Sequence, residues 1–197
     1  MLRRRAGFLG RMALEVAYQC LGTKVDTPVV ISSRHGEAAR SVDLLLELAN
    51  NRPLSPTSFG LSVHNATGGL FSIARADHAN SIAIAGGDST IEYAVIEACS
   101  LLATGAAAVL LINCDCPLPP VYSRFEDCKE QPYAWAWLIG PPADSVISLS
   151  CVVDAKNESA DDRPLPPGLE ILRFYFCQDR LLERNCDRRR WLWSRNA

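Results

Sequence analysis

The sequence has almost no net charge and no long apolar run. Twenty lysines and arginines stand against 22 aspartates and glutamates, which leaves a formal net charge of −2 at pH 7. This balance is unlike the basic surface of a protein that binds nucleic acid or an anionic membrane. The longest apolar candidate, residues 106–112, falls far short of the roughly 18 residues that a membrane span requires, and it predicts a buried strand. We therefore expect no nucleic-acid partner and no membrane span.

We also expect no export signal. Residues 1–5 are basic, but residues 6–16 contain Arg11 and Glu15 and form no apolar block. A reducing cytoplasm is then the predicted location, and the eight cysteines are expected to be free thiols. Half of them lie in apolar segments and are predicted to be buried: Cys20, Cys99, Cys151 and Cys177.

The chain lacks a paired Cys-x-x-Cys unit. Cys114, Cys116 and Cys128 are close in sequence but have no histidine nearby, so zinc is disfavoured and we expect no metal and no cofactor. Asp115, at the end of an apolar run, is expected to cap or turn the chain towards Pro117.

Apolar periodicity predicts helices that alternate with strands, and hence a layered α/β fold. Helices are predicted over residues 10–21, 41–50, 66–76 and 90–102, and strands over 29–31, 81–85, 107–112, 133–139 and 146–153. Residues 54–59 are rich in serine, threonine and proline and predict a loop.

The predicted organisation is one main domain with an extension. Residues 1–153 form the domain, and residues 154–168 form an exposed loop that contains three prolines. Residues 169–197, which are rich in arginine, are predicted to be a basic helical extension.

Residues 81–90 (Ser-Ile-Ala-Ile-Ala-Gly-Gly-Asp-Ser-Thr) are the most informative segment. A buried strand, a turn at Gly86 and Gly87, and a helix start together have the shape of a nucleophile elbow. The tip carries Asp88, a poor nucleophile for acyl transfer, and its simplest role is to cap the helix that follows. Ser89 could attack only with a base beside it. The segment therefore indicates a non-catalytic relative of an enzyme.

Two histidines lie in polar clusters. His35, in the segment Ser33–Glu37, could form a dyad with Glu37, but a hydrogen-bonded turn is the favoured interpretation. His64 and Asn65 lie between apolar stretches and predict a polar pair that fixes a loop.

The elbow and the small-residue strand 106–111 resemble the N-terminal half of a β-ketoacyl synthase of the thiolase fold, over residues 10–153. The segments 55–59 and 64–73 are similar to the family's dimer-forming and acyl-pocket region. This resemblance implies the following interface and tunnel candidates: His64, Asn65, Ala66, Gly68, Gly69 and Phe71.

The resemblance also implies that the catalytic groups are absent. Condensing members carry a cysteine where Asp88 lies, and the nearest cysteine in sequence, Cys99, is three helical turns from the tip. They also use two histidines from the C-terminal half, whereas the last histidine here is His78. Family folds begin with a strand before the first helix, so we expect a lost first strand or a truncated N-terminus.

Four segments in order, Ser33–Glu37, Ser62–Ala66, Ala85–Asp88 and Asp115–Pro119, resemble the short chain length factors of aryl polyene clusters. The resemblance implies a non-catalytic subunit that pairs with a ketosynthase, shapes the acyl tunnel of the heterodimer and works with an acyl carrier protein. The alternative is a free-standing acyltransferase or thioesterase that uses Ser89 or His35.

The tail over residues 188–195 combines arginines with two tryptophans. Such a patch could bind nucleic acid or an acidic carrier protein. The favoured interpretation is that the tryptophans pack on the core while the arginines stay in water.

Overall fold

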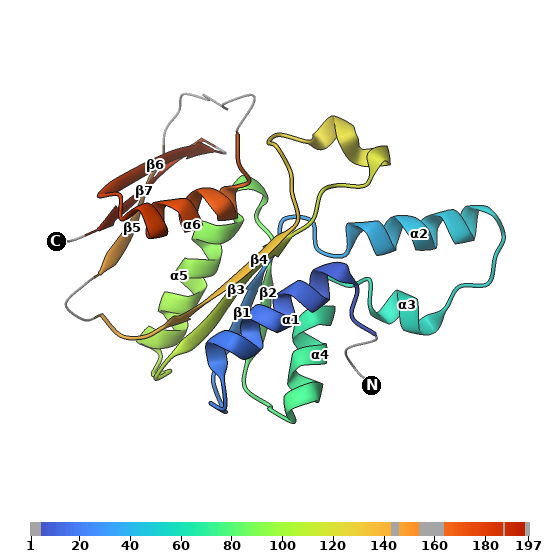
Figure 1. Cartoon of the computed structure of the whole chain (residues 1–197), viewed down its shortest axis with the longest axis horizontal. Coiled ribbons are helices and arrows are strands. Elements are labelled where there is room, and N and C mark those ends of the chain that lie inside the picture. Colours follow the sequence, from blue (N-terminus) through green and yellow to red (C-terminus); the bar gives the residue numbers. More distant parts are fainter. Residues whose placement is uncertain (1–4, 143–145, 154–163, 187, 196–197) are drawn as a thin grey trace.

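The computed structural model describes residues 5–142, 146–153, 164–186 and 188–195 (Figure 1). Its main sheet has four strands in the order β2-β1-β3-β4. Their bounds are β1 Val29–Ser32, β2 Ser81–Ile84, β3 Val109–Asp115 and β4 Tyr133–Ile139. β1 runs parallel to β2 and β3, and β4 runs antiparallel to β3. Every residue of β3 is buried, including Asn113 and Asp115, and its first four residues form a continuous apolar run.

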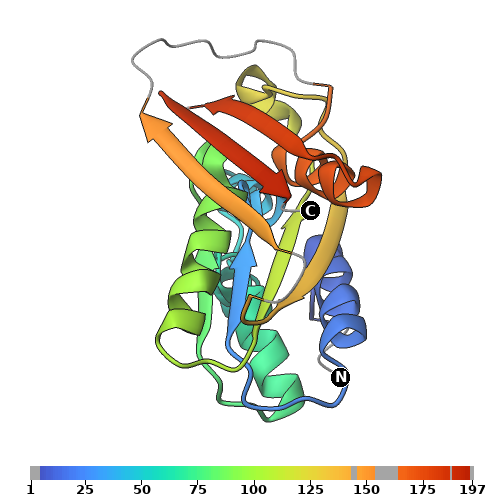
Figure 2. The same cartoon turned by 90° about the vertical axis from the view of Figure 1, so that its left-hand side faces the viewer.

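Helices cover both faces of this sheet (Figure 2). The helices of the main layer are α1 Phe8–Leu21, α2 Ala38–Ala49, α3 Pro56–Gly60, α4 Ala66–Arg75 and α5 Thr90–Ala103. α1 packs against Leu110 and Ile112 of β3, while α5 packs against Val109 and Leu111 on the opposite face. The alternation of β3 side chains thus divides the core into two clusters.

A second sheet of three antiparallel strands, in the order β5-β7-β6, packs beside α5 and α6. Its elements are β5 Ile147–Val153, α6 Pro167–Cys177, β6 Leu181–Cys186 and β7 Arg189–Arg195. Trp193 of β7 and Phe174 of α6 belong to the core cluster of α5. Among the described residues, no helix is long and apolar enough to cross a membrane.

The prediction of a helical C-terminal extension is wrong beyond Cys177, because two strands follow α6. Trp191 and Trp193 are buried while Arg190 is exposed and Leu192 is half-buried, a period of two that marks a strand. β5 pairs with β7 across the predicted boundary, and the domain division itself stays a prediction. Residues 154–163 of the predicted loop lie outside the described residues.

Two further expectations need correction. Residues Pro56–Gly60 form a short helix instead of a loop, because the Ser55 side chain accepts the N–H of Ser58 and Pro56 opens the first turn. Of the four cysteines predicted to be buried, Cys20 is half-buried and the other three are exposed: Cys99, Cys151 and Cys177. All eight cysteines are free thiols, and the buried ones are Cys114 and Cys186.

Candidate functional site

The predicted strand, turn and helix are present at residues 81–90. β2 ends at Ile84, and a short 3₁₀ turn, η2 Gly87–Ser89, leads into α5. Gly87 has a φ of +56°, a conformation that favours glycine. A Cβ on Gly86 would lie 2.5 Å from the Tyr93 ring, so both glycines are required by the turn.

The tip residue Asp88 belongs to an ion-pair cluster. Its Oδ1 lies 3.4 Å from Nη2 of Arg34, whose side chain is 7% exposed. The same nitrogen donates to both carboxylate oxygens of Asp127, at 2.7 and 2.6 Å. Burial opposes the charge of each group, but the Arg34–Asp127 interaction outweighs burial; it raises the pKa of Arg34 and lowers that of Asp127. Arg34 and Asp127 therefore stay ionised at neutral pH.

Asp88 does not occupy the capping position that the sequence suggested. Ser89 is the N-cap residue of α5, and its side chain makes no capping hydrogen bond. The hydroxyl of Thr90 accepts the N–H of Gly86 at 2.9 Å and donates to the carbonyl of Gly87 at 2.6 Å, which closes the turn. The carboxylate of Asp88 is directed to Arg34 instead.

Among the described residues, no base contacts the hydroxyl of Ser89. The residue is fully buried, its Oγ lies 3.2 Å from Sγ of Cys186, and it accepts the indole N–H of Trp191 at 3.0 Å. Neither neighbour can take a proton from a serine. Burial raises the pKa of Cys186 above its ordinary value, so this sulfur is a thiol. The geometry gives Ser89 a packing role.

Two thiols come to the elbow that the sequence did not place there. Cys186 reaches Ser89 from β6, and Sγ of Cys128 lies 3.5 Å from Nη1 of Arg34. Burial raises the pKa of Cys128 to about 11. Since the thiolate is the nucleophile, a cysteine that stays largely protonated near neutral pH is a weak nucleophile. Both cysteines are distant from the elbow in sequence, and no local sequence pattern predicts that they lie near it.

A second ion-pair cluster, which is buried, contacts the backbone of the elbow. Arg184 of β6 donates to Glu92 of α5 and, at 2.8 Å, to Glu170 of α6. It also donates to the backbone carbonyl of Asp88 at 3.2 Å. Trp193 adds an indole N–H to Glu92 at 3.2 Å. This cluster ties the second sheet to the elbow, and sequence reasoning missed it.

A family model described as the β-ketoacyl synthase N-terminal domain matches residues 1–194. The chain belongs to this family. No curated protein matches the chain. The predicted family and the layered α/β, thiolase-like fold are confirmed.

Two solved structures resemble this β-ketoacyl synthase family member. The first is a ketosynthase (ApeO) in complex with its chain length factor (ApeC) from Xenorhabdus doucetiae. It is 27% identical with a TM-score of 0.85, and the match covers 97% of this chain and 79% of that chain. The second, an ishigamide ketosynthase/chain length factor, is 17% identical with a TM-score of 0.64, and the match covers 78% and 51% of the two chains. The second likeness shows the fold alone.

His35 does not pair with Glu37 as one interpretation held. Its Nε2 lies 3.0 Å from Glu130, while Glu37 pairs with Arg40 at 3.6 Å. The favoured interpretation, a hydrogen-bonded turn, is present, because the hydroxyl of Ser33 accepts the N–H of Gly36 at 2.8 Å.

Asp115 fixes this turn from the end of β3. Its Oδ1 accepts the Ser33 hydroxyl and the Arg34 N–H, both at 2.8 Å, and Oδ2 accepts the Tyr133 hydroxyl at 3.2 Å. Burial raises the pKa of the Asp115 carboxyl despite these hydrogen bonds. The sequence predicted that Asp115 caps or turns the chain locally towards Pro117. Instead, its carboxylate makes long-range hydrogen bonds that join the ends of β1 and β3.

The predicted interface residues divide into two groups. Phe71 is buried and packs edge-on against Tyr18, and a Cβ on Gly68 would lie 2.7 Å from Oγ of Ser81. His64 is held by the Ser33 carbonyl, 2.9 Å from its Nε2. Ala66 is half-buried, whereas Asn65 and Gly69 are exposed on one side of α4. An interface or tunnel role for the six residues stays a prediction.

The acidic group closest to a metal-like arrangement comprises Asp127, Cys128 and Glu130, whose ligand atoms lie within 4.8 Å of one another. Arg34 already occupies Asp127 and contacts Cys128, and Glu130 binds His35 and the N–H of Leu118. A guanidinium that contacts two of the three residues opposes a second cation. Cys114 and Cys116 do not belong to it. The absence of a metal and of a cofactor stays a prediction.

Proposed function

We propose that this chain is the non-catalytic chain length factor of a heterodimer with a β-ketoacyl-acyl carrier protein synthase. The observation that carries the proposal is the elbow tip. The family resemblance puts the nucleophilic cysteine where Asp88 lies, and here the carboxylate is paired with Arg34. A carboxylate held by a guanidinium is a poor nucleophile for a thioester, and the nearby thiols have raised pKa values.

The likeness to the Xenorhabdus doucetiae structure supports the choice of partner, because that structure is a ketosynthase with its chain length factor. In the proposed complex the ketosynthase performs the condensation and this chain shapes the tunnel that limits the growing polyene or fatty-acid-type chain. The substrate is delivered by an acyl carrier protein. A cytoplasmic location also stays part of the proposal.

The chain carries an exposed apolar surface that suits such a partner. We define the α2–α3 arm as residues 38–60, which extend away from the main sheet in Figure 1. Leu44 is the buried residue of α2, and the arm leaves several large apolar side chains largely in solvent: Leu45, Leu46, Leu48, Leu54 and Phe59. A cluster of this kind marks an interaction surface. We propose that it packs on the ketosynthase together with Asn65 and Gly69.

The direct test is co-expression of the tagged chain with a ketosynthase from the same organism. We expect a stoichiometric complex by size-exclusion chromatography with light scattering, and condensation of carrier-bound substrates only when both subunits are present. A ketosynthase whose nucleophilic cysteine is replaced by alanine should give no product with the wild-type chain. The Asp88→Asn variant of this chain should keep the rate within about twofold, since the carboxylate performs no step.

Condensation or thioester hydrolysis by the isolated chain would contradict the assignment and favour the free-standing acyltransferase or thioesterase. A chain that stays monomeric and shows no affinity for the ketosynthase would also contradict it.

The α2–α3 arm is tested by a matched pair of leucines. Leu48 is 57% exposed on α2, and Leu181 is 56% exposed on β6. Leu48→Lys should weaken binding to the ketosynthase by about tenfold or more, as expected for a charge placed in an apolar contact. Leu181→Lys should leave it unchanged. Because both sites are exposed, neither variant should change the free energy of unfolding by more than about 0.5 kcal/mol. Isothermal titration calorimetry would give the affinities. Equal losses of ketosynthase affinity in the two variants would show that the α2–α3 arm is not the binding surface.

A further inference from the structure

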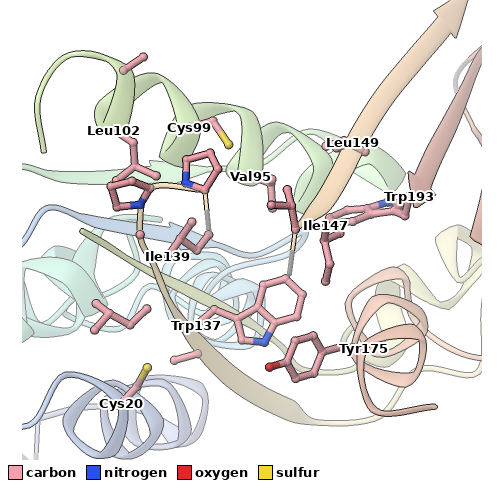
Figure 3. A pocket seen from close by; sticks show the side chains of 17 residues that line it. Cys20, Val95, Cys99, Leu102, Trp137, Ile139, Ile147, Leu149, Tyr175 and Trp193 are labelled. Atoms are coloured by element: carbon pink, nitrogen blue, oxygen red, sulfur yellow. The ribbon is translucent and has the colours of Figure 1, made fainter. Parts of the chain in front are cut away.

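A large apolar pocket lies away from the elbow, along β4 (Figure 3). Its volume is about 850 Å³, which falls within the range of about 300–1,000 Å³ for small-molecule sites. Its walls come from α1, β4, α5, β5, α6 and β7. On α5 the lining starts at Val95 and continues to Ala103, so the pocket follows the half of the helix that is remote from Asp88.

Among the residues that the structure describes, the lining contains no aspartate, glutamate, lysine, arginine or histidine. Trp137, Tyr175 and Trp193 form an aromatic side of the pocket, and the rings of Trp137 and Tyr175 have centroids 5.3 Å apart. The indole N–H of Trp193 is engaged by Glu92. A charged group inside this pocket would lose its hydration without gaining a partner, so the chemistry selects an uncharged ligand.

The lining of the pocket favours a hydrocarbon chain over an extended peptide as the ligand. An extended peptide brings an N–H and a C=O at every residue, and each buried one needs a partner. The side chains of the pocket offer few such partners, and Cys20 already makes a hydrogen bond with the backbone of Leu138 on β4. A hydrocarbon chain requires none, and it gains from each methylene that leaves water.

We infer that this pocket binds the extended hydrocarbon chain of a lipid-like small molecule, with any polar headgroup left at the mouth. The inference does not depend on the ketosynthase partnership, because every described residue of the lining belongs to this chain.

cis-Parinaric acid, a conjugated fatty acid that accepts energy from tryptophan, is a direct probe. We expect saturable binding to the isolated chain with quenching of tryptophan emission. Unbranched alcohols should displace it in the order dodecanol, decanol, octanol, and each step of two methylenes should strengthen the competition about tenfold. Absence of saturable binding, or equal competition by the three alcohols, would overturn the inference.

Adjacent residues of α5 supply a matched pair of variants. Cys99 lines the pocket, whereas Ser100 is also exposed but does not line it. Cys99→Phe places an aromatic ring in the pocket and should weaken parinaric acid binding at least about tenfold, while Ser100→Phe should not change it. Unchanged binding by Cys99→Phe would place the ligand elsewhere.

Alkylation of the wild-type protein avoids any concern about folding of the variants. Cys99, Cys151 and Cys177 are all exposed, but of these three only Cys99 lines the pocket. Dodecanol should therefore slow the reaction of Cys99 with N-ethylmaleimide, followed by peptide mass spectrometry, and leave the other two cysteines unaffected. Equal rates at Cys99 with and without dodecanol would contradict the inference, as would protection by a peptide alone.

Discussion

Replacing Arg184 by methionine is expected to lower the free energy of unfolding by about 3–5 kcal/mol. Arg184 is 5% exposed, and its guanidinium joins Glu92 of α5, Glu170 of α6 and the carbonyl of Asp88. Glu92 is fully buried. Without Arg184, its carboxylate keeps only the Trp193 indole N–H among the contacts described above, and a buried charge without its counter-ion is strongly destabilising. Urea unfolding followed by tryptophan fluorescence measures the loss.

The matched control is Arg190→Met on the neighbouring strand. Arg190 lies 3.8 Å from Glu183 with both side chains more than 40% exposed, and an ion pair of this kind contributes about 0–1 kcal/mol. The double variant Arg184→Met with Glu92→Gln should recover part of the loss, because it removes the isolated charge. A loss of less than about 1 kcal/mol in Arg184→Met would show that Glu92 is neutral or solvated in the native protein.

The sequence predicted the elements whose pattern is local. β4 occupies the predicted residues Tyr133–Ile139, and α5 begins at the predicted Thr90. Both depend on a period that a short window reveals, and the elbow between β2 and α5 depends on two adjacent glycines. Such features require no knowledge of what lies across the sheet.

The candidate site is formed by contacts between residues that are far apart in sequence, so no short stretch of sequence contains both partners. Asp127 reaches Arg34, Cys186 reaches Ser89, and Arg184 reaches Glu92, with sequence separations of 93, 97 and 92 residues. The sequence shows each of these groups in a polar or mixed segment and gives no partner. Capping by Asp88 was therefore the best local prediction, and the structure replaces it with the ion pair to Arg34.

The prediction of a helix over the C-terminal segment was wrong for a different reason. Arginine is a good helix former, and the arginines of residues 169–197 favoured a helix over the whole segment. Burial decides instead: Trp191 and Trp193 enter the core on alternate residues, which a strand permits and a helix does not.

Gly168→Ala is expected to lower the free energy of unfolding by about 1–3 kcal/mol, as overpacking of a tight core does. Gly168 is the second residue of α6, and a Cβ there would overlap Oδ1 of Asn113 and lie 2.5 Å from the hydroxyl of Tyr133. The carbonyl of Gly168 accepts the indole N–H of Trp135 at 3.1 Å. Relief of the overlap must move α6 away from β3 and β4, which weakens this hydrogen bond and the packing of Ile171 and Phe174.

Gly69→Ala is the matched control, and its expected change in the free energy of unfolding has the opposite sign. Gly69 lies inside α4 and is exposed, and a Cβ at this position would meet no atom within 4 Å. Alanine there should raise the free energy of unfolding by about 0.5–1 kcal/mol, because it lowers the conformational entropy of the unfolded chain and favours the helix. Urea unfolding midpoints of the two variants should thus move in opposite directions from the wild-type value. A Gly168→Ala variant as stable as Gly69→Ala would mean that α6 does not pack against Asn113 and Tyr133 as closely as the structure has it.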